Sequence, residues 1–143
     1  MVQNQYIKDK PYILSYNQTS KPEIVNEKIY VSPFLNETFS DNPLKQKERT
    51  YPIDLIYPQK RIYNSSVLIP EGYKVDYLPS EQMIDNQLFE LTYSINSDEN
   101  QINITFVYYL KESVYPATEY SKIKSYFNEI VKKGIEKIVF TKM

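Results

Sequence analysis

Residues 48–80, which read ERTYPIDLIYPQKRIYNSSVLIPEGYKVDYLPS, contain the clearest strand and turn signals of the chain. From Tyr51 to Tyr57 apolar side chains recur at every second position, which is typical of a strand with one buried face. Pro52 lacks the N–H that a sheet ladder needs, so we expect this strand to lie at a sheet edge or to begin there. After Pro58, a second extended segment is expected over Arg61–Ile69.

A tight turn and a third strand follow. In Ile69-Pro70-Glu71-Gly72 proline takes the second position and glycine the fourth, which favours a type I turn. Residues 73–77 alternate between apolar and charged side chains and predict a strand, which Pro79 ends.

A β-hairpin is the strongest pattern outside this stretch. Residues 89–95 and 102–110 alternate between apolar and polar side chains on either side of the polar turn Asn96–Asn100. The polar segments 36–48 and 80–87 predict connecting loops. Tyr109 and Val107 fall on the opposite face of their strand from the apolar series, and we expect that face to be buried as well or covered by the helix.

The period changes to that of a helix over residues 118–133. Four apolar side chains form one stripe there: Ile123, Phe127, Ile130 and Val131. Thr118 is the expected N-cap and Gly134 the expected C′ residue, while Lys132 and Lys133 suit the negative end of the helix dipole. A last short strand is predicted over 135–140.

The order of elements predicts a mainly β fold. We expect an immunoglobulin-like antiparallel β-sandwich with one C-terminal α-helix, at about 118–133, covering one end or face, followed by the short final strand. Residues 1–25 are expected to be a linker or N-terminal extension with one strand at 12–16. Residues 26–143 would form the sandwich domain, with one or two strands over 23–34.

Composition limits the functions open to this chain. Hydrophobic residues at 41% and charged residues at 24% of 143 positions are typical of one globular domain, and 15 tyrosines against two glycines favour strands. A net charge of −1 offers no attraction to nucleic acid or to an anionic membrane. No apolar run is long enough to span a membrane. The chain has no Cys and no His, so the usual nucleophile and general base are missing.

Two motif matches fail on closer inspection. Ser121–Lys124 fits S-x-x-K and Ser40-Asp41-Asn42 fits S-D-N, but the two occur in reverse order and K-T-G is missing. Asp98-Glu99-Asn100 suggests a calcium loop, but Asn103 and Tyr109 occupy the positions where an EF-hand needs Gly and a carboxylate. We therefore predict no catalytic, cofactor-binding or metal-binding residues and no cofactor.

Four Asn-x-Ser/Thr triplets, at Asn17, Asn36, Asn64 and Asn103, are expected by chance in a chain of this composition.

Three patterns of turns and core positions carry a family resemblance. They are Asn42-Pro43-Leu44-Lys45 through Arg49-Thr50-Tyr51-Pro52-Ile53-Asp54, then Ile69-Pro70-Glu71-Gly72-Tyr73 to Leu78-Pro79, and Tyr115-Pro116 followed by Tyr120, Lys124 and Phe127. In these patterns residues 28–143 resemble the C-terminal domain, of unknown function, of large bacterial extracytoplasmic proteins. Those proteins also carry an N-terminal β-rich domain and a central transglutaminase-like (papain-fold) domain.

The resemblance implies a non-catalytic accessory or structural domain of a larger exported protein. It would position the neighbouring transglutaminase-like domain or dock a protein or glycan partner, in a periplasmic or outer-membrane-associated location. The reactive Cys, His and Asp of that family would lie in the central domain, and the export signal would lie upstream, with Met1 the start of a fragment. An alternative is a carbohydrate-binding module that uses exposed tyrosines, and an enzyme in its own right is the least favoured interpretation.

Overall fold

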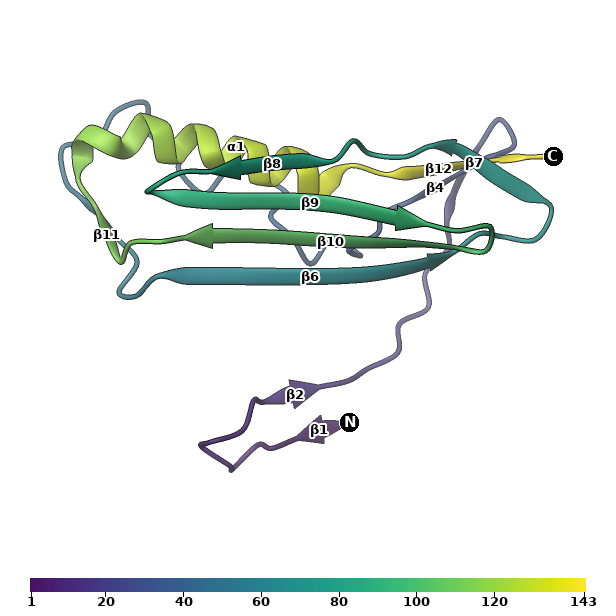
Figure 1. Ribbon diagram of the computed structural model, residues 1–143, viewed down its shortest axis with the longest axis horizontal. Coiled ribbons are helices and arrows are strands. Elements are labelled where there is room, and N and C mark those ends of the chain that lie inside the picture. Colours follow the sequence, from purple (N-terminus) through teal and green to yellow (C-terminus); the bar gives the residue numbers. More distant parts are fainter.

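The computed structural model describes residues 1–143 and contains one long antiparallel sheet that runs the length of the molecule (Figure 1). The sheet has the order β6–β10–β9–β8. Its strands are β6 (Gln59–Leu68), β8 (Gln82–Asp85), β9 (Phe89–Ser97) and β10 (Gln101–Leu110). Alternation along β10 buries every second side chain, while the others remain half exposed.

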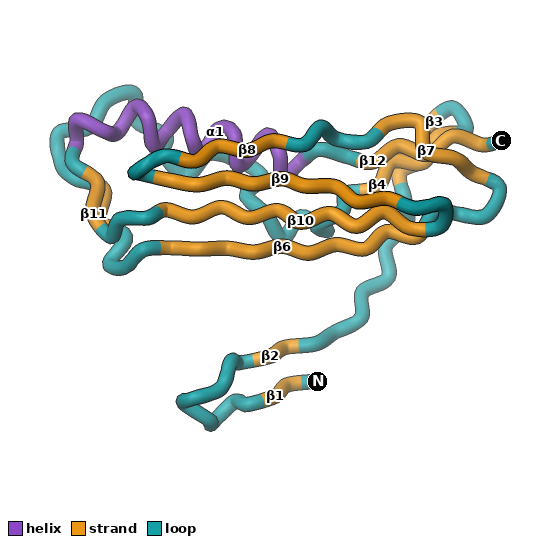
Figure 2. The backbone as a smooth tube through the Cα atoms, viewed as in Figure 1, coloured by secondary structure: helices purple, strands orange, loops and turns teal.

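The second layer is built from a small sheet and a helix that lie end to end (Figures 1 and 2). The small sheet has the order β3–β4–β12–β7. Its strands are β3 (Glu23–Val25), β4 (Lys28–Val31), β7 (Tyr73–Tyr77) and β12 (Ile138–Lys142). Helix α1 (Tyr120–Ile135) follows a 3₁₀ turn, η1 (Ala117–Glu119), and leads directly into β12.

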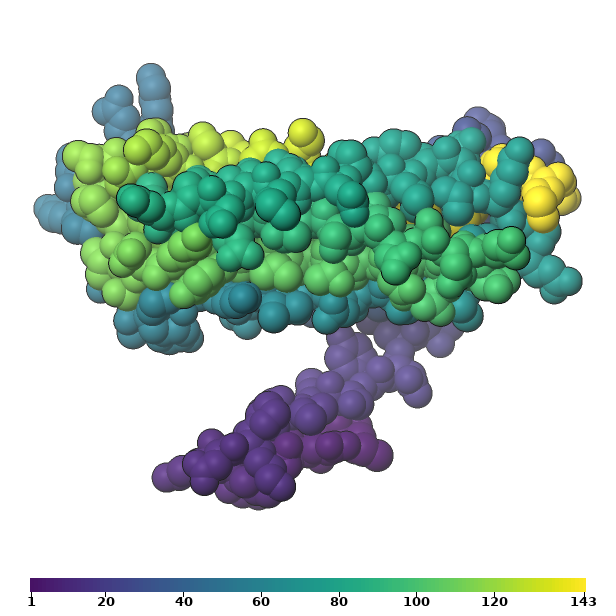
Figure 3. Space-filling model, viewed as in Figure 1, coloured from purple at the N-terminus to yellow at the C-terminus, as the bar shows by residue number.

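Two pairs of very short strands complete the structure. At one end of the molecule β5 (Ile53–Asp54) pairs with β11 (Val114–Tyr115). Near the N-terminus β1 (Val2–Gln3) pairs with β2 (Ile13–Leu14) in an arm that stands away from the body (Figure 3).

One hydrophobic core lies between the two layers. Twelve large side chains in it are less than 2% exposed: Tyr93, Tyr115, Tyr126, Phe106, Phe140, Leu91, Ile102, Ile104, Leu110, Ile123, Ile130 and Ile138. They come from the long sheet, from β11, from α1 and from β12, so the helix and the small sheet share a single core. Burial of this apolar surface is the main force that stabilises the fold.

The predicted fold class is confirmed: the protein is a mainly β, antiparallel sandwich with one C-terminal helix and a final strand. The predicted hairpin is confirmed as β9 and β10, which pair in register from Ile102–Ser97 to Leu110–Phe89. In the hairpin turn the Asp98 carboxylate accepts the N–H groups of Asn100 and Gln101, at 2.8 and 2.9 Å.

The strand expected over Tyr51–Tyr57 is largely wrong. Only Ile53 and Asp54 pair in a sheet, and the rings of Tyr51 and Tyr57 are exposed. The Asp54 carboxylate accepts the N–H of Ile56 at 2.8 Å, and Ile56 has a left-handed backbone, with φ 71°. This side-chain turn competes with the sheet ladder and ends the strand after two residues.

The turn before β7 is displaced by one residue from its predicted position. The N–H of Tyr73 donates to the carbonyl of Pro70 at 3.0 Å, so Gly72 takes the third position of the turn instead of the fourth. Its φ of 81° is the positive value that a type II turn requires there.

The ends of the helix also differ from the prediction. Thr118 lies in η1 and is not the N-cap; α1 begins at Tyr120, after Glu119, without a side-chain cap hydrogen bond. Gly134 lies inside the helix, where its carbonyl accepts the Thr38 hydroxyl at 3.1 Å. The helix therefore continues to Ile135, and the last strand begins at Ile138 rather than at 135.

Three strands, β1, β8 and β11, were missed because each has only two to four residues, too few to show a period. β8 lies within residues 80–87, predicted as a loop, and pairs with β9 from Gln82–Tyr93 to Asp85–Glu90. β11 spans two residues only. Pairing with an already formed neighbour, rather than local pattern, makes these segments strands.

Replacement of Gly134 by alanine should destabilise the protein by about 1–3 kcal/mol, because the new methyl group overpacks a closed contact. An added Cβ would lie 2.5 Å from the Thr38 hydroxyl oxygen and 2.8 Å from its Cβ. Urea unfolding of Gly134→Ala measures the loss. The control is Ser125→Ala on the exposed face of the same helix, which should change stability by less than about 0.5 kcal/mol. Equal midpoints for the two variants would contradict the assigned packing role.

Candidate functional site

A cleft with a volume of about 770 Å³ lies between α1 and the turn that joins β8 to β9. Its apolar lining comes from Ile84, Leu88, Phe89 and Tyr126, and its polar lining includes Ser121, Ser125 and Glu129. A surface of this mixture suits a partner with both apolar and hydrogen-bonding groups.

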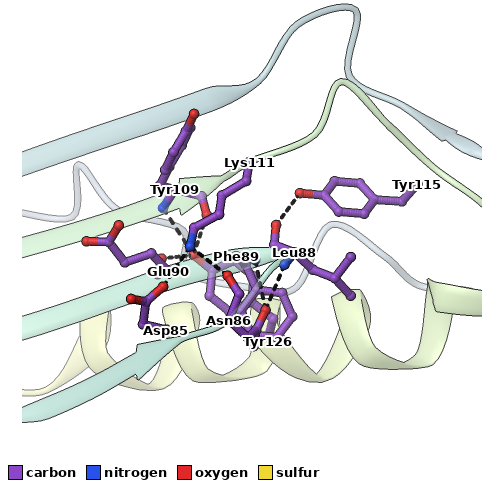
Figure 4. Close-up of polar contacts among 9 residues, drawn as sticks. All are labelled: Asp85, Asn86, Leu88, Phe89, Glu90, Tyr109, Lys111, Tyr115 and Tyr126. Atoms are coloured by element: carbon purple, nitrogen blue, oxygen red, sulfur yellow. Dashed lines mark hydrogen bonds and ion pairs between the residues drawn. The ribbon is translucent and has the colours of Figure 1, made fainter.

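Tyr126 fixes the floor of the cleft (Figure 4). Its hydroxyl donates to the carbonyl of Glu90 and accepts the N–H of Tyr109 at 3.2 Å, which ties the helix to β9 and β10. Its ring stacks on Phe89, with 4.0 Å between ring centroids and 20° between planes. Burial raises the pKa of the Tyr126 phenol above its ordinary value.

The β8–β9 turn at the rim is held by its own polar contacts (Figure 4). The side-chain oxygen of Asn86 accepts the N–H groups of Leu88 and Phe89, at 2.9 and 3.0 Å. Lys111 Nζ donates to the Asp85 carboxylate and to the Asn86 carbonyl, both at 2.6 Å. The hydrogen bond to Asp85 raises the pKa of Lys111.

The hydroxyl of Tyr115, on β11, also reaches the rim of the cleft. Tyr115 donates to the Leu88 carbonyl at 2.6 Å and accepts the N–H of Glu112 at 3.1 Å. The cleft is thus preformed, with rigid walls on both sides.

Two charged side chains of the cleft have partners within the molecule. Glu129 accepts the side-chain amide of Gln82 at 3.0 Å, and Lys122 pairs with Glu119 at 2.9 Å. Ser121 and Ser125 are exposed on the helix surface, and no basic group hydrogen-bonds either hydroxyl. Nucleophilic catalysis needs such a pair of groups within hydrogen-bond reach.

The helix places Ser121 and Lys124 of the S-x-x-K match on different stripes of its surface. Ser121 faces the cleft, whereas Lys124 Nζ donates to the Gln46 carbonyl at 2.6 Å on the neighbouring stripe of α1. Asn42 also lies against that stripe, where its amide donates to the Lys124 carbonyl at 2.9 Å. These residues fasten the 36–48 loop to the helix.

No group of three or more Asp, Glu, His or Cys side chains lies close enough together to hold a metal ion. The structure also contains no helix with the length and apolar character needed to cross a membrane.

The tyrosines do not form a row on the long sheet. Tyr109 is the only tyrosine on its outer face, and Lys60 Nζ lies 5.6 Å from that ring. The expectation that this face is buried or covered by the helix is wrong, because α1 packs on the inner face. The outer positions Asn103 and Thr105 are polar and tolerate solvent.

Lys133 is a buried cation at the junction of α1 with the small sheet. Its side chain is 3% exposed, and Nζ donates to the Ser80 carbonyl at 2.6 Å and to Glu136 at 3.2 Å. Nζ also lies 5.0 Å from the centre of the Tyr93 ring. The sequence pattern assigned Lys133 only to the helix dipole, because neighbouring Lys132, which is exposed, gives the same local signal.

Substitution of Lys133 by alanine should lower the free energy of unfolding by about 3 kcal/mol, since it leaves Glu136 without its partner and opens a cavity. Lys133→Met, which keeps the aliphatic stem, should cost less. Urea unfolding of both, with exposed Lys132→Ala as the control, measures the difference. The assignment is refuted if Lys133→Ala and Lys132→Ala unfold at the same midpoint.

Alkaline pH should unfold the protein through its buried phenols. Burial raises the pKa values of Tyr93, Tyr108, Tyr115 and Tyr126 above the ordinary value near 10. The contribution of these buried phenols to folding stability is complete below a pH of about 10. It is lost as the pH rises further, because their hydroxyls ionise more readily in the unfolded chain than in the folded one. Tyrosinate absorbance and circular dichroism, followed together, should show these rings ionising only as the fold is lost. Full ionisation in a folded chain would oppose this account.

The chain belongs to a protein family. Residues 27–140 match the family described as "Domain of Unknown Function with solved-structure structure (DUF3858)". No curated protein matches the sequence.

A solved structure with a similar fold comes from Parabacteroides distasonis and is described as a "putative protease". It has a TM-score of 0.66 and 18% sequence identity, over 82% of this chain and 24% of that one. The chain therefore spans about a quarter of that protein's length, and at this identity the likeness concerns the fold alone.

Proposed function

We propose that this protein is a non-catalytic accessory domain of a larger exported bacterial protein, in which it positions a neighbouring transglutaminase-like domain or docks a partner. The proposal rests on one observation: a similar fold forms part of a longer chain in the P. distasonis structure. The similar P. distasonis structure has 24% of its length in the region that this chain covers. A unit of this size acts on the rest of its chain through the surfaces that it presents.

The residues behind the family resemblance support a framework role. The Tyr120 hydroxyl and Lys124 Nζ both donate to the carbonyl of Gln46, at 2.7 and 2.6 Å, and Asn42 donates to the helix backbone. Side chains engaged in internal hydrogen bonds of this kind hold a loop in place. They are not free to bind a substrate.

The cleft between α1 and the β8–β9 turn is the surface that we assign to docking. Its walls are preformed, its floor is apolar at Phe89 and Tyr126, and its rim offers the hydroxyls of Ser121 and Ser125. An apolar centre with a polar rim is the usual anatomy of a protein interface.

The family resemblance carried by the turns and core positions supports the nature of the neighbour and the location. A papain-fold neighbour accords with the description of the P. distasonis protein as a "putative protease". The same resemblance supports export to the periplasm or the outer membrane.

Thermal unfolding of the isolated chain and of the same residues within the full-length parent tests the proposal. The domain should melt several degrees higher in the parent, because docking stabilises only the folded state. Ser125→Arg, placed on the exposed helix face in the cleft, should remove that gain and leave the isolated chain unchanged.

Asn96→Arg is the matched control, because Asn96 is equally exposed and lies at the other end of β9. The Asn96→Arg variant should keep the higher melting temperature in the parent. Identical melting temperatures in the isolated chain and in the parent would show an autonomous domain and defeat the docking proposal.

A further inference from the structure

Strand β6 presents the longest free sheet edge of the molecule. It pairs with β10 over ten residues without a break in register, and nothing pairs with its other side. Ile62 and Leu68 on this strand are 58% and 71% exposed. A long, regular edge with apolar side chains is a template for another strand.

The other edges lack this character. β8 has four residues and β3 has three. β7 has five, and its pairing with β12 is interrupted by a register shift at Val139–Phe140. Short or bulged edges discourage the addition of a strand, so β6 is distinct among them.

A cavity of about 450 Å³ opens beside the β6 edge. It lies between the 37–39 segment and the strand, and its aromatic lining comes from Phe39, Tyr63 and Tyr108. Phe39 is 38% exposed. A strand added along β6 would send alternate side chains toward this cavity.

The N-terminal arm contains an unburied apolar segment of strand-forming sequence. Residues 12–16 read Tyr-Ile-Leu-Ser-Tyr, and all of them are exposed. Their only strand pairing is the two-residue contact of β2 with β1. Two short strands alone are marginal in water, so this segment gains stability by joining a sheet.

The base of the arm is already fastened next to the β6 edge. The Tyr16 hydroxyl donates to the Glu37 carboxylate at 2.9 Å, and Glu37 lines the cavity. The carbonyl of the same Glu37 accepts the hydroxyl of Tyr63 on β6, at 3.5 Å. The arm leaves the body on this side of the long sheet (Figures 1 and 3).

We propose that the β6 edge and the adjoining aromatic cavity bind residues 12–16 of a second copy of this chain, in a reciprocal exchange of arms that forms a dimer. Main-chain hydrogen bonds to β6 would supply the affinity, and the aromatic cavity would select the apolar side chains of the segment. The proposal goes beyond the accessory role, because it does not depend on which domain precedes this one.

The direction of β2 relative to β6 favours binding of the arm of a second copy over binding of the chain's own arm. β2 and β6 run the same way along the molecule (Figure 1), so pairing within one chain would be parallel. A twofold axis perpendicular to the strands reverses the partner's arm and makes the pairing antiparallel. Antiparallel pairing is slightly more stable per residue, and a twofold dimer buries two such contacts.

The chain has no cysteine, so single cysteines can report the contact. Ser15→Cys in a tagged chain and Asn64→Cys in an untagged chain are mixed and joined with a short bis-maleimide. Both positions are exposed, so neither change should disturb the fold. We expect a covalent dimer that contains one tagged and one untagged chain, and a light-scattering mass of two chains before crosslinking.

Leu14→Asp, in the middle of the arm segment, should reduce the crosslinked yield about tenfold or more and shift the mass to one chain. Ile7→Asp is the matched control, since it adds the same charge to the arm outside the segment. It should leave the dimer intact.

Three results would overturn the proposal. One is a monomer at every concentration with no crosslink between chains. Another is an equal yield when Asn96→Cys, on β9 and two strands away from β6, replaces Asn64→Cys. The third is a crosslink inside a monomeric chain that carries both Ser15→Cys and Asn64→Cys, which would place the arm on its own β6.

Discussion

The buried face of β10 is the surface on which the rest of the structure depends. Its five inward side chains, Ile102, Ile104, Phe106, Tyr108 and Leu110, are at most 4% exposed. β6 and β9 flank it in one layer, while α1 and the small sheet close over it from the other. Because β10 has only one buried face, the helix and the small sheet must both pack on it. They do so by lying end to end. The outer face stays partly open to solvent and carries both polar side chains, such as Asn103 and Thr105, and apolar ones, such as Ile62.

The helix and the small sheet meet at a junction over this surface. The buried polar side chains Thr38 and Lys133 lie at that junction. Lys133 reaches from the last turns of α1 to Ser80, between β7 and β8, and lies over the ring of Tyr93. A buried cation is costly unless it is fully paired, so its partners must be in place. Gly134 follows at once and lets Thr38 approach the helix backbone. Together these contacts fix where the helix ends and the small sheet begins.

The surfaces left free by this packing are the cleft beside α1 and the edge of β6. The patterned residues of the family are used inside the fold: Asn42, Tyr120 and Lys124 bind a loop to the helix. The cleft instead depends on an element with a weak sequence signal, the β8–β9 turn.

The sequence by itself determined the hairpin of β9 and β10, the apolar stripe of α1 and the sandwich class, because periods of two and of 3.6 residues are local properties of a chain. It located Ser121 on the helix, but the cleft that Ser121 lines requires β8 and its turn, which are strands only through pairing with β9. The short β5, the role of Gly134 and the burial of Lys133 likewise depended on tertiary structure. Each is decided by a contact between residues far apart in the chain, whose effect no local pattern records.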